Sequence, residues 1–367
     1  MVDHRRRKRL SEALIIIGLV LLPLLFWWRL WAPDPADRAA LPEGDFSSQY
    51  YPLQMFAARE LSMGRLPAWN PYINGGQPGL ADIQTGFYYP PNLAPNLILA
   101  LLGLEFSIEL LTAQVVLHFS LASLFTYLFA RHLARRSGAR IPAARFAGAV
   151  SALAFTYGGY LTTFPVQQLT ILETAVWLPL VLLFMDRAFL CTKPFPQIIG
   201  AGLALACALL AGHPQTAMYV TYVVLAYGLF LIWSLRQRKN GTPKTGTSGR
   251  RSPKQGLLLV LLLLVLGVAL AAVQLGPTLG FIARSTRAGL DYDAVAWGFP
   301  LTEITHLLYP GYFGGSPQYS GILPMILAVA ALFVVRARRE VIFWLCLGLV
   351  ALLLAFGGNT FLYSVTY

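Results

Sequence analysis

Residues 257–280 read LLLVLLLLVLGVALAAVQLGPTLG, a run of 24 residues without a charged side chain. A helix rises about 1.5 Å per residue, so about 20 apolar residues cross the roughly 30 Å hydrocarbon layer of a bilayer. This run is therefore long and apolar enough to span a membrane. It decides the class of fold to which the chain belongs.

The rest of the chain repeats this pattern. Of its 367 residues, 56% are hydrophobic and only 12% are charged, whereas a soluble domain carries about 25% charged residues. A water-soluble globular protein is excluded, and we expect an all-α polytopic membrane protein with about nine transmembrane helices. A shorter apolar run at 93–103 predicts an interfacial or re-entrant helix. The other eight predicted spans are 13–31, 107–130, 144–163, 169–189, 196–211, 214–233, 320–335 and 341–357.

The charges predict how these spans are oriented. The net charge is +12, but the cations gather in short clusters between apolar runs, which argues against nucleic-acid binding. With the N-terminus in the cytoplasm, 22 of the 28 Lys and Arg residues lie on the cytoplasmic side, as the positive-inside rule requires. Three cysteines, Cys191, Cys207 and Cys346, lie in or beside apolar runs and predict no disulfide framework.

Five regions follow from this topology. Residues 1–31 form a basic N-terminus and an uncleaved signal anchor, and 107–280 form a helical bundle with a basic cytoplasmic loop at 234–256. Residues 320–367 form a C-terminal pair of helices. The two remaining regions are a first external loop at 32–106 and a second at 281–319. Ordered loops of this length are usually functional, so we expect the site between them.

The first external loop opens with Asp45, which precedes a predicted amphipathic helix at 46–63 on the membrane surface. At the N-cap, the helix dipole and free amides would stabilise the ionised carboxylate. Asp45 is a candidate general base or a plain capping residue. Aromatic rings and amides follow, and these suit sugar rings and hydroxyls. The candidate substrate-binding residues of this loop are Gln49, Tyr50, Trp69, Asn70, Asp82 and Gln84.

The run from Asp45 to Pro91 resembles the first external loop of the YfhO-like bacterial membrane proteins, a branch of the GT-C glycosyltransferase superfamily. Shorter strings farther along the chain extend the resemblance over nearly its whole length: Gly212 to Gln215, Gln274 to Pro277, Arg284 to Arg287, Tyr309 to Gly311 and Tyr319 to Pro324.

This resemblance implies a GT-C-like bundle in the bacterial cell membrane, with the large first loop on the outer face. It also implies transfer of a sugar from a polyprenyl-phosphate donor to a cell-envelope glycan, lipid or protein. The acidic residue that acts in this transfer corresponds to Asp45. Family members are roughly twice as long, so this chain is expected to be a fragment or a truncated product.

A lipid-phosphate sugar has a good leaving group, so one base for the acceptor hydroxyl suffices, unlike the paired carboxyl groups of glycoside hydrolysis. The donor phosphate needs positive charge outside the bilayer. Arg284 and Arg287 lie three residues apart and either grip phosphate oxygens or snorkel from the seventh span.

Three histidines are weaker candidates. His213, with Gln215, either binds phosphate or a sugar hydroxyl or caps the preceding helix. His118 is expected to donate a hydrogen bond between helices. His306 lies beside Glu303 in the second loop.

Asp82 and Gln84 are candidates to bind acceptor hydroxyls. Alternatively, they help Asp45 or Glu303 to hold a divalent cation. No local cluster has metal-ligand spacing, however, and no cofactor is expected. The main functional alternative is a transporter or flippase of lipid-linked sugars. Against it, the spans show few ionisable residues at mid-membrane depth. A non-catalytic scaffold would not require so polar and aromatic a loop.

Overall fold

The computed structural model describes residues 2–41, 43–239, 251–286, 296–310, 317–334 and 338–362. These ranges are mostly helical, as predicted. Their one sheet is a short antiparallel ladder that pairs β1 (Trp69–Asn70) with β2 (Gln77–Pro78).

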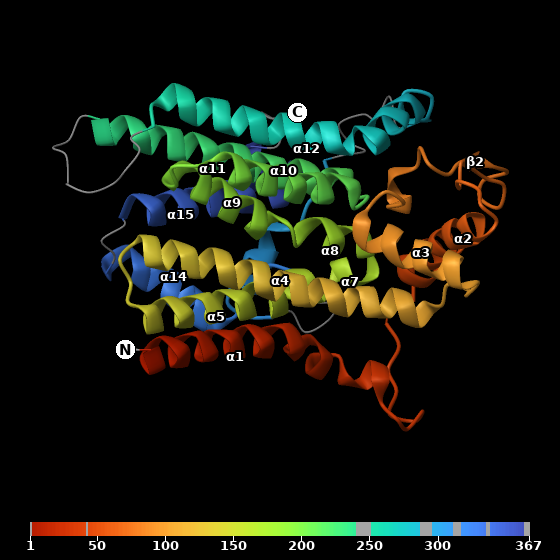
Figure 1. Cartoon of the computed structure of the whole chain (residues 1–367), viewed down its shortest axis with the longest axis horizontal. Coiled ribbons are helices and arrows are strands. Elements are labelled where there is room, and N and C mark those ends of the chain that lie inside the picture. The colour runs from red at the N-terminus through yellow and green to blue at the C-terminus, as the bar shows by residue number, and fades with distance from the viewer. Residues whose placement is uncertain are drawn as a thin grey trace.

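The long helices run side by side (Figure 1). On one side of the bundle, α4 (Ile108–Arg136) packs against α5 (Ile141–Tyr157) and α1 (Val2–Phe26). The chain enters α1 and leaves α4 at the same end of the bundle. The first long loop lies at the opposite end.

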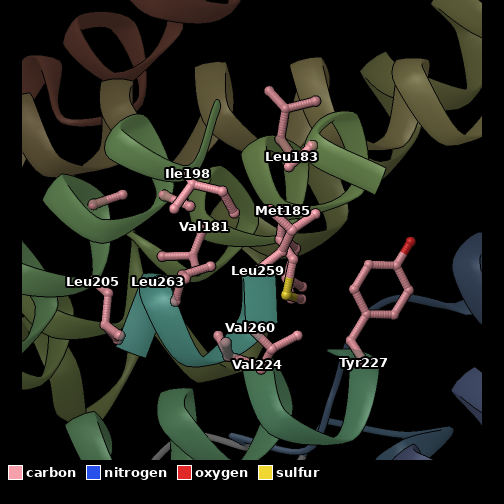
Figure 2. Close-up of a cluster of buried hydrophobic side chains, with 14 of the residues drawn as sticks. Val181, Leu183, Met185, Ile198, Leu205, Val224, Tyr227, Leu259, Val260 and Leu263 are labelled. Atoms are coloured by element: carbon pink, nitrogen blue, oxygen red, sulfur yellow. The ribbon is translucent and has the colours of Figure 1, made fainter. Parts of the chain in front are cut away.

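The apolar core lies on the other side of the bundle. There, α9 (Leu178–Leu190) contacts α10 (Phe195–Leu210), α11 (Pro214–Lys239) and α12 (Pro253–Ile282), and it also reaches α4. Figure 2 shows side chains from α9, α10, α11 and α12 meeting in the core. The fully buried members include Met185, Leu205, Val224, Tyr227 and Leu263.

Four helical stretches in the described ranges are long and apolar enough to cross a membrane. In α12, Leu259 and Leu263 face the core, whereas Leu261 and Val265 are exposed although they are apolar. An exposed apolar face is expected where lipid is the solvent, so this is a helical membrane protein. The four stretches are Ile108–Arg136, Leu169–Leu190, Pro214–Gln237 and Pro253–Ile282.

The other predicted spans are also helical, but shorter or interrupted. Residues 144–163 do not form one helix, because α5 ends at Tyr157 and the chain continues as α6 (Gly159–Thr162). Gly158 is extended there (φ −67°, ψ 163°), which breaks the helix. The elements α7 (Phe164–Gln167) and α8 (Leu169–Ala175) follow. Near the C-terminus lie α14 (Ile322–Val334), α15 (Arg338–Ala355) and the 3-10 turn η6 (Gly357–Asn359).

Helices occupy both segments of the first loop for which the sequence predicts them. The π-turn η2 (Phe46–Tyr50) leads into α2 (Tyr51–Ser62), and α3 (Pro90–Leu102) follows the 3-10 turn η3 (Ile83–Thr85). In α3 the amides Asn92 and Asn96 are buried, whereas leucines of the opposite face are exposed. This is the reverse of a helix on a water-soluble protein, and it suits an interfacial helix. Two further 3-10 turns are η1 (Trp28–Trp31) and η5 (Leu301–Leu307).

Candidate functional site

The first long loop is anchored on the C-terminal part of α12. Gln274 Nε2 donates a hydrogen bond to the backbone carbonyl of Leu80 at 2.9 Å, and the Thr278 hydroxyl donates to the carbonyl of Ala81 at 2.9 Å. The two side chains lie one helical turn apart, so they share a face of α12. These bonds place the following residue, Asp82, beside the end of a candidate spanning helix.

A cavity of about 1380 Å³ lies between α2, this loop and the end of α12. Such a volume is larger than most small-ligand pockets, which occupy about 300–1,000 Å³. The loop contributes most of the polar side chains of the wall, and α2 and α12 contribute mainly apolar ones. The polar lining includes Gln49, Asn70, Asp82, Gln84, His213 and Gln215, and the apolar lining includes Leu53, Phe56, Phe281 and Ile282.

The carboxylate of Asp82 is held in a defined orientation on the cavity wall. Its Oδ1 accepts a hydrogen bond from the backbone N–H of Gln84 at 3.0 Å, which caps η3, and its Oδ2 accepts one from Gln77 Nε2 at 3.2 Å. Gln49 Nε2 in turn donates to Gln84 Oε1 at 3.0 Å. The predicted candidates Gln49, Asp82 and Gln84 therefore come together although they lie on separate parts of the loop.

His213 lines the same cavity and caps a helix. The backbone N–H of Thr216 donates to His213 Nδ1 at 3.1 Å, so the ring caps the following helix, α11, and not the preceding helix as the sequence suggested. Burial lowers the pKa of His213, which keeps the ring neutral. Because Nδ1 accepts, the ring proton is on Nε2. The neighbouring Gln215 donates to the Tyr219 hydroxyl at 2.8 Å.

Asp45 does not line the cavity, although Ser48 and Gln49 of the next turn do. Its Oδ2 accepts a hydrogen bond from Gln168 Nε2 at 3.2 Å. Asp45 occupies the N-cap position of η2 without a side-chain capping bond, so the predicted cap is wrong. The reason is local: its backbone is helical (φ −55°, ψ −31°), whereas a capping side chain reaches the first-turn amides from an extended backbone.

Two aromatic candidates also lie outside the cavity lining. Tyr50 is buried, its hydroxyl lies 3.1 Å from Thr170 Oγ1, and burial raises its pKa. Trp69 is exposed, and its indole covers Gly76, where an added Cβ would lie 2.7 Å from the ring. Both residues have structural contacts that explain their presence.

The candidates of the second long loop are not gathered at the cavity either. Arg284 is exposed and does not line it, although Ser285 and Thr286 do. Arg287 lies outside the described residues. Glu303 in η5 accepts a hydrogen bond from Gln318 Nε2 at 3.1 Å, and its Oε2 lies 3.9 Å from His306 Nδ1.

Sequence reasoning missed Arg59, a cation of α2 that lines the cavity. The helical period indicated it, because Gln49, Leu53, Phe56 and Arg59 recur at intervals of three or four residues and share one face. Only the position of that face against the cavity, which depends on tertiary packing, gives Arg59 its place in the site.

The residues named for a divalent cation do not meet. Asp82 lines the cavity, whereas Asp45 and Glu303 do not. In the ranges that the structure describes, no three His, Cys, Asp or Glu side chains are grouped so that they could hold a metal ion.

Comparison with protein-family models, curated proteins and solved structures finds no match for this chain. The resemblance to the YfhO-like proteins therefore stays a prediction.

Proposed function

We propose that the protein is a membrane glycosyltransferase that moves a sugar from a polyprenyl-phosphate carrier to a cell-envelope acceptor. The amphipathic cavity carries the proposal. Amides and the carboxylate of Asp82 suit sugar hydroxyls, and Phe281 and Ile282, at the end of a candidate spanning helix, suit the first units of a lipid chain. A donor that is part sugar and part lipid matches both walls.

The chemistry requires one base and one anion-binding group. The acceptor hydroxyl oxygen attacks the anomeric carbon, and the bond from that carbon to the phosphate oxygen breaks. The phosphate leaves with the electron pair, and the hydroxyl proton passes to a carboxylate. Arg59 in the lining and Arg284 beside it would stabilise the phosphate charge.

Two carboxylates are candidates for the base. The resemblance assigns the role to Asp45, which lies one turn from the cavity-lining Gln49. The cavity itself favours Asp82, because its carboxylate lines the wall and two hydrogen bonds hold it in place. Replacing each in turn by asparagine distinguishes them, because an amide cannot accept the proton.

We further propose nine spans, a cytoplasmic N-terminus, an external first loop and location in the bacterial cell membrane. The direction of the helices supports this topology, because the basic start of α1 and the basic end of α4 lie at one end of the bundle and α2 and α3 at the other (Figure 1). An excess of cations at one end is typical of the cytoplasmic side.

Mass spectrometry of envelope glycans and lipid-linked sugars, with and without the intact gene, tests the function. We expect one glycan to disappear and its lipid-linked donor to accumulate in the deletion strain. Complementation with Asp82→Asn or Asp45→Asn should fail for the true base, whereas Asp34→Asn, a change at an exposed loop position, should restore the glycan. If deletion leaves both pools unchanged, the transferase proposal is wrong.

A flippase of lipid-linked sugars is the second candidate, and one observation favours it. Glu173 is buried within the candidate span Leu169–Leu190, and ionisable groups inside the membrane are typical of coupled transport. An assay of donor orientation across the membrane separates the two functions, because loss of a transferase leaves the accumulated donor on the outer face.

A further inference from the structure

A second polar cluster lies where α3, α4 and α8 meet, and none of its residues lines the cavity. Glu173 of α8, Asn92 of α3 and Gln114 of α4 are each at most 3% exposed. Asn92 Nδ2 lies 3.4 Å from Glu173 Oε2, and Gln114 Nε2 donates to the carbonyl of Pro91 at 3.5 Å. Asn92 and Glu173 thus contact each other directly, and Gln114 bonds to the residue that precedes Asn92.

Each of these side chains keeps an oxygen without a partner. Glu173 Oε1, Asn92 Oδ1 and Gln114 Oε1 are buried and accept no hydrogen bond from any residue that the structure describes. Exchanging the oxygen and nitrogen of the Asn92 amide does not solve this, because Nδ2 already faces two acceptors, Glu173 Oε2 and the carbonyl of Gly86. Buried acceptors without donors are rare, and each unpaired one is costly.

The neighbouring donors are already engaged. Trp177 Nε1 donates to the Tyr89 hydroxyl at 2.8 Å, and the His118 Nδ1 proton goes to the carbonyl of Gln114 at 2.6 Å. His118 Nε2 is then an acceptor, so the Tyr89 hydroxyl donates to it at 2.8 Å. The sequence predicted that His118 donates a hydrogen bond to a neighbouring segment. In the structure His118 instead accepts one, from the Tyr89 hydroxyl.

The carboxyl group also lacks a positive partner. Among the residues that the structure describes, no Lys, Arg or His forms an ion pair with Glu173, and the hydroxyl of Tyr89, which lies 3.3 Å from the Glu173 backbone carbonyl, is an uncharged group. By contrast, the buried Asp186 of α9 is paired with Arg136 and His132. A buried carboxylate without such a partner is unfavourable unless a cation neutralises it.

We propose that Glu173, Asn92 and Gln114 bind one monovalent alkali cation, sodium or potassium. A single ion that contacts all three oxygens satisfies each of them, whereas a proton on Glu173 Oε1 pairs that atom with only one amide oxygen and leaves the other amide oxygen unpaired. One positive charge balances one carboxylate, and a divalent ion would leave a buried excess charge. Carboxylate and amide oxygens are the ligands that hard cations prefer.

The ion would fasten the loop to the bundle. Asn92 belongs to α3 and Glu173 to a candidate spanning stretch, so the bound cation ties the interfacial helix to the membrane core. This site does not depend on the proposed glycosyl transfer, because none of its ligands lines the cavity.

Thermal unfolding of the full-length protein in detergent tests the site. Sodium or potassium chloride is titrated against choline chloride at constant ionic strength and pH. An ion that binds only the folded state should raise the melting temperature in a saturable way, by about 3 °C or more at high concentration. The sodium and potassium series identify the preferred ion. Gln114→Leu should move the midpoint of the titration to higher cation concentration.

Glu173→Gln should remove the cation dependence, and Glu109→Gln, a change of an exposed acid on α4, should preserve it. If Glu173→Gln does not fold, equilibrium dialysis of the wild-type protein with radioactive sodium or potassium still decides, with one ion per chain expected. Equal melting temperatures in all three salts with no bound ion would overturn the proposal. A melting temperature that follows pH but not the cation would also overturn it, since that indicates a protonated Glu173.

Discussion

The side-chain amide of Gln274 reaches across 194 positions of sequence to donate a hydrogen bond to the backbone carbonyl of Leu80 at 2.9 Å. Gln274 is fully buried in α12 although it sits in the most apolar run of the chain. A polar side chain in such a run is costly unless it is bonded, so its position indicates a specific role in holding the loop.

Gln274→Leu should therefore loosen the first loop. The substitution leaves the carbonyl of Leu80 without its donor, and we expect a loss of about 1–3 kcal/mol in the free energy of unfolding. Thermal unfolding in detergent measures it. Leu279→Ala, at an exposed position of the same helix, is the matched control and should have little effect. Equal losses in the two variants would mean that the bond to Leu80 does not hold the loop.

Stability should fall in acid because of His213. Burial lowers its pKa in the folded protein below the usual value of about 6.5. As the pH falls below about 6.5, His213 becomes protonated in the unfolded chain but stays neutral in the folded protein. The free energy of unfolding therefore decreases until the pH reaches the pKa of His213 in the folded protein. Melting temperatures from pH 8 to pH 5 measure this slope.

His213→Asn keeps a capping side chain without a titrating ring, so its melting temperature should depend less on pH. An unchanged slope in that variant would assign the acid sensitivity to another group.

Asp186→Asn should destabilise the bundle strongly. Asp186 is fully buried and accepts hydrogen bonds from His132 at 2.7 Å and Tyr227 at 2.8 Å, and from Arg136. Removing its charge leaves Arg136 poorly compensated, which costs about 3–5 kcal/mol for buried pairs. Chemical or thermal unfolding in detergent would show the loss.

Glu340→Gln is the control for this pair, because Glu340 also binds Arg136 but is partly exposed. Its effect should be clearly smaller. If both variants lose the same stability, Asp186 is not the principal partner of Arg136.

Arg59→Gln should weaken donor use more than acceptor use, provided that the protein transfers sugar from a lipid phosphate. Loss of a phosphate contact should raise the KM for a synthetic polyprenyl-phosphate hexose by about tenfold, as expected for one charge-assisted hydrogen bond. Arg284→Gln tests the second cation, and Arg29→Gln, at a position that does not line the cavity, is the control. An unchanged KM for the donor in both variants would remove the phosphate-binding role.

Much of the fold follows from local patterns. In the described ranges, helices form most of the predicted apolar segments, because a backbone without water satisfies its hydrogen bonds within the helix. The break after Tyr157 was missed, since hydropathy averages over a window and does not register one extended glycine. The sequence predicts that His213 caps the preceding helix, whereas it caps the following one, α11. Sequence position does not distinguish the two, because His213 lies between both helices.

The site was harder to predict. The sequence named Gln49, Asp82, Gln84 and His213, and these meet at one cavity. It also named Asp45, Tyr50 and Trp69 with the same reasoning from residue type, yet these pack elsewhere. Residue type indicates which chemistry is available, whereas the direction of a side chain depends on the helix against which its own element packs.

The amino-acid sequence by itself determined that lipid is the solvent of this chain, because the length and polarity of each run are local properties. Only the tertiary structure decided which polar groups face one another. Contacts such as Gln274 with Leu80, and Asn92 with Glu173, join residues far apart in the chain, and their formation depends on how several helices pack at once.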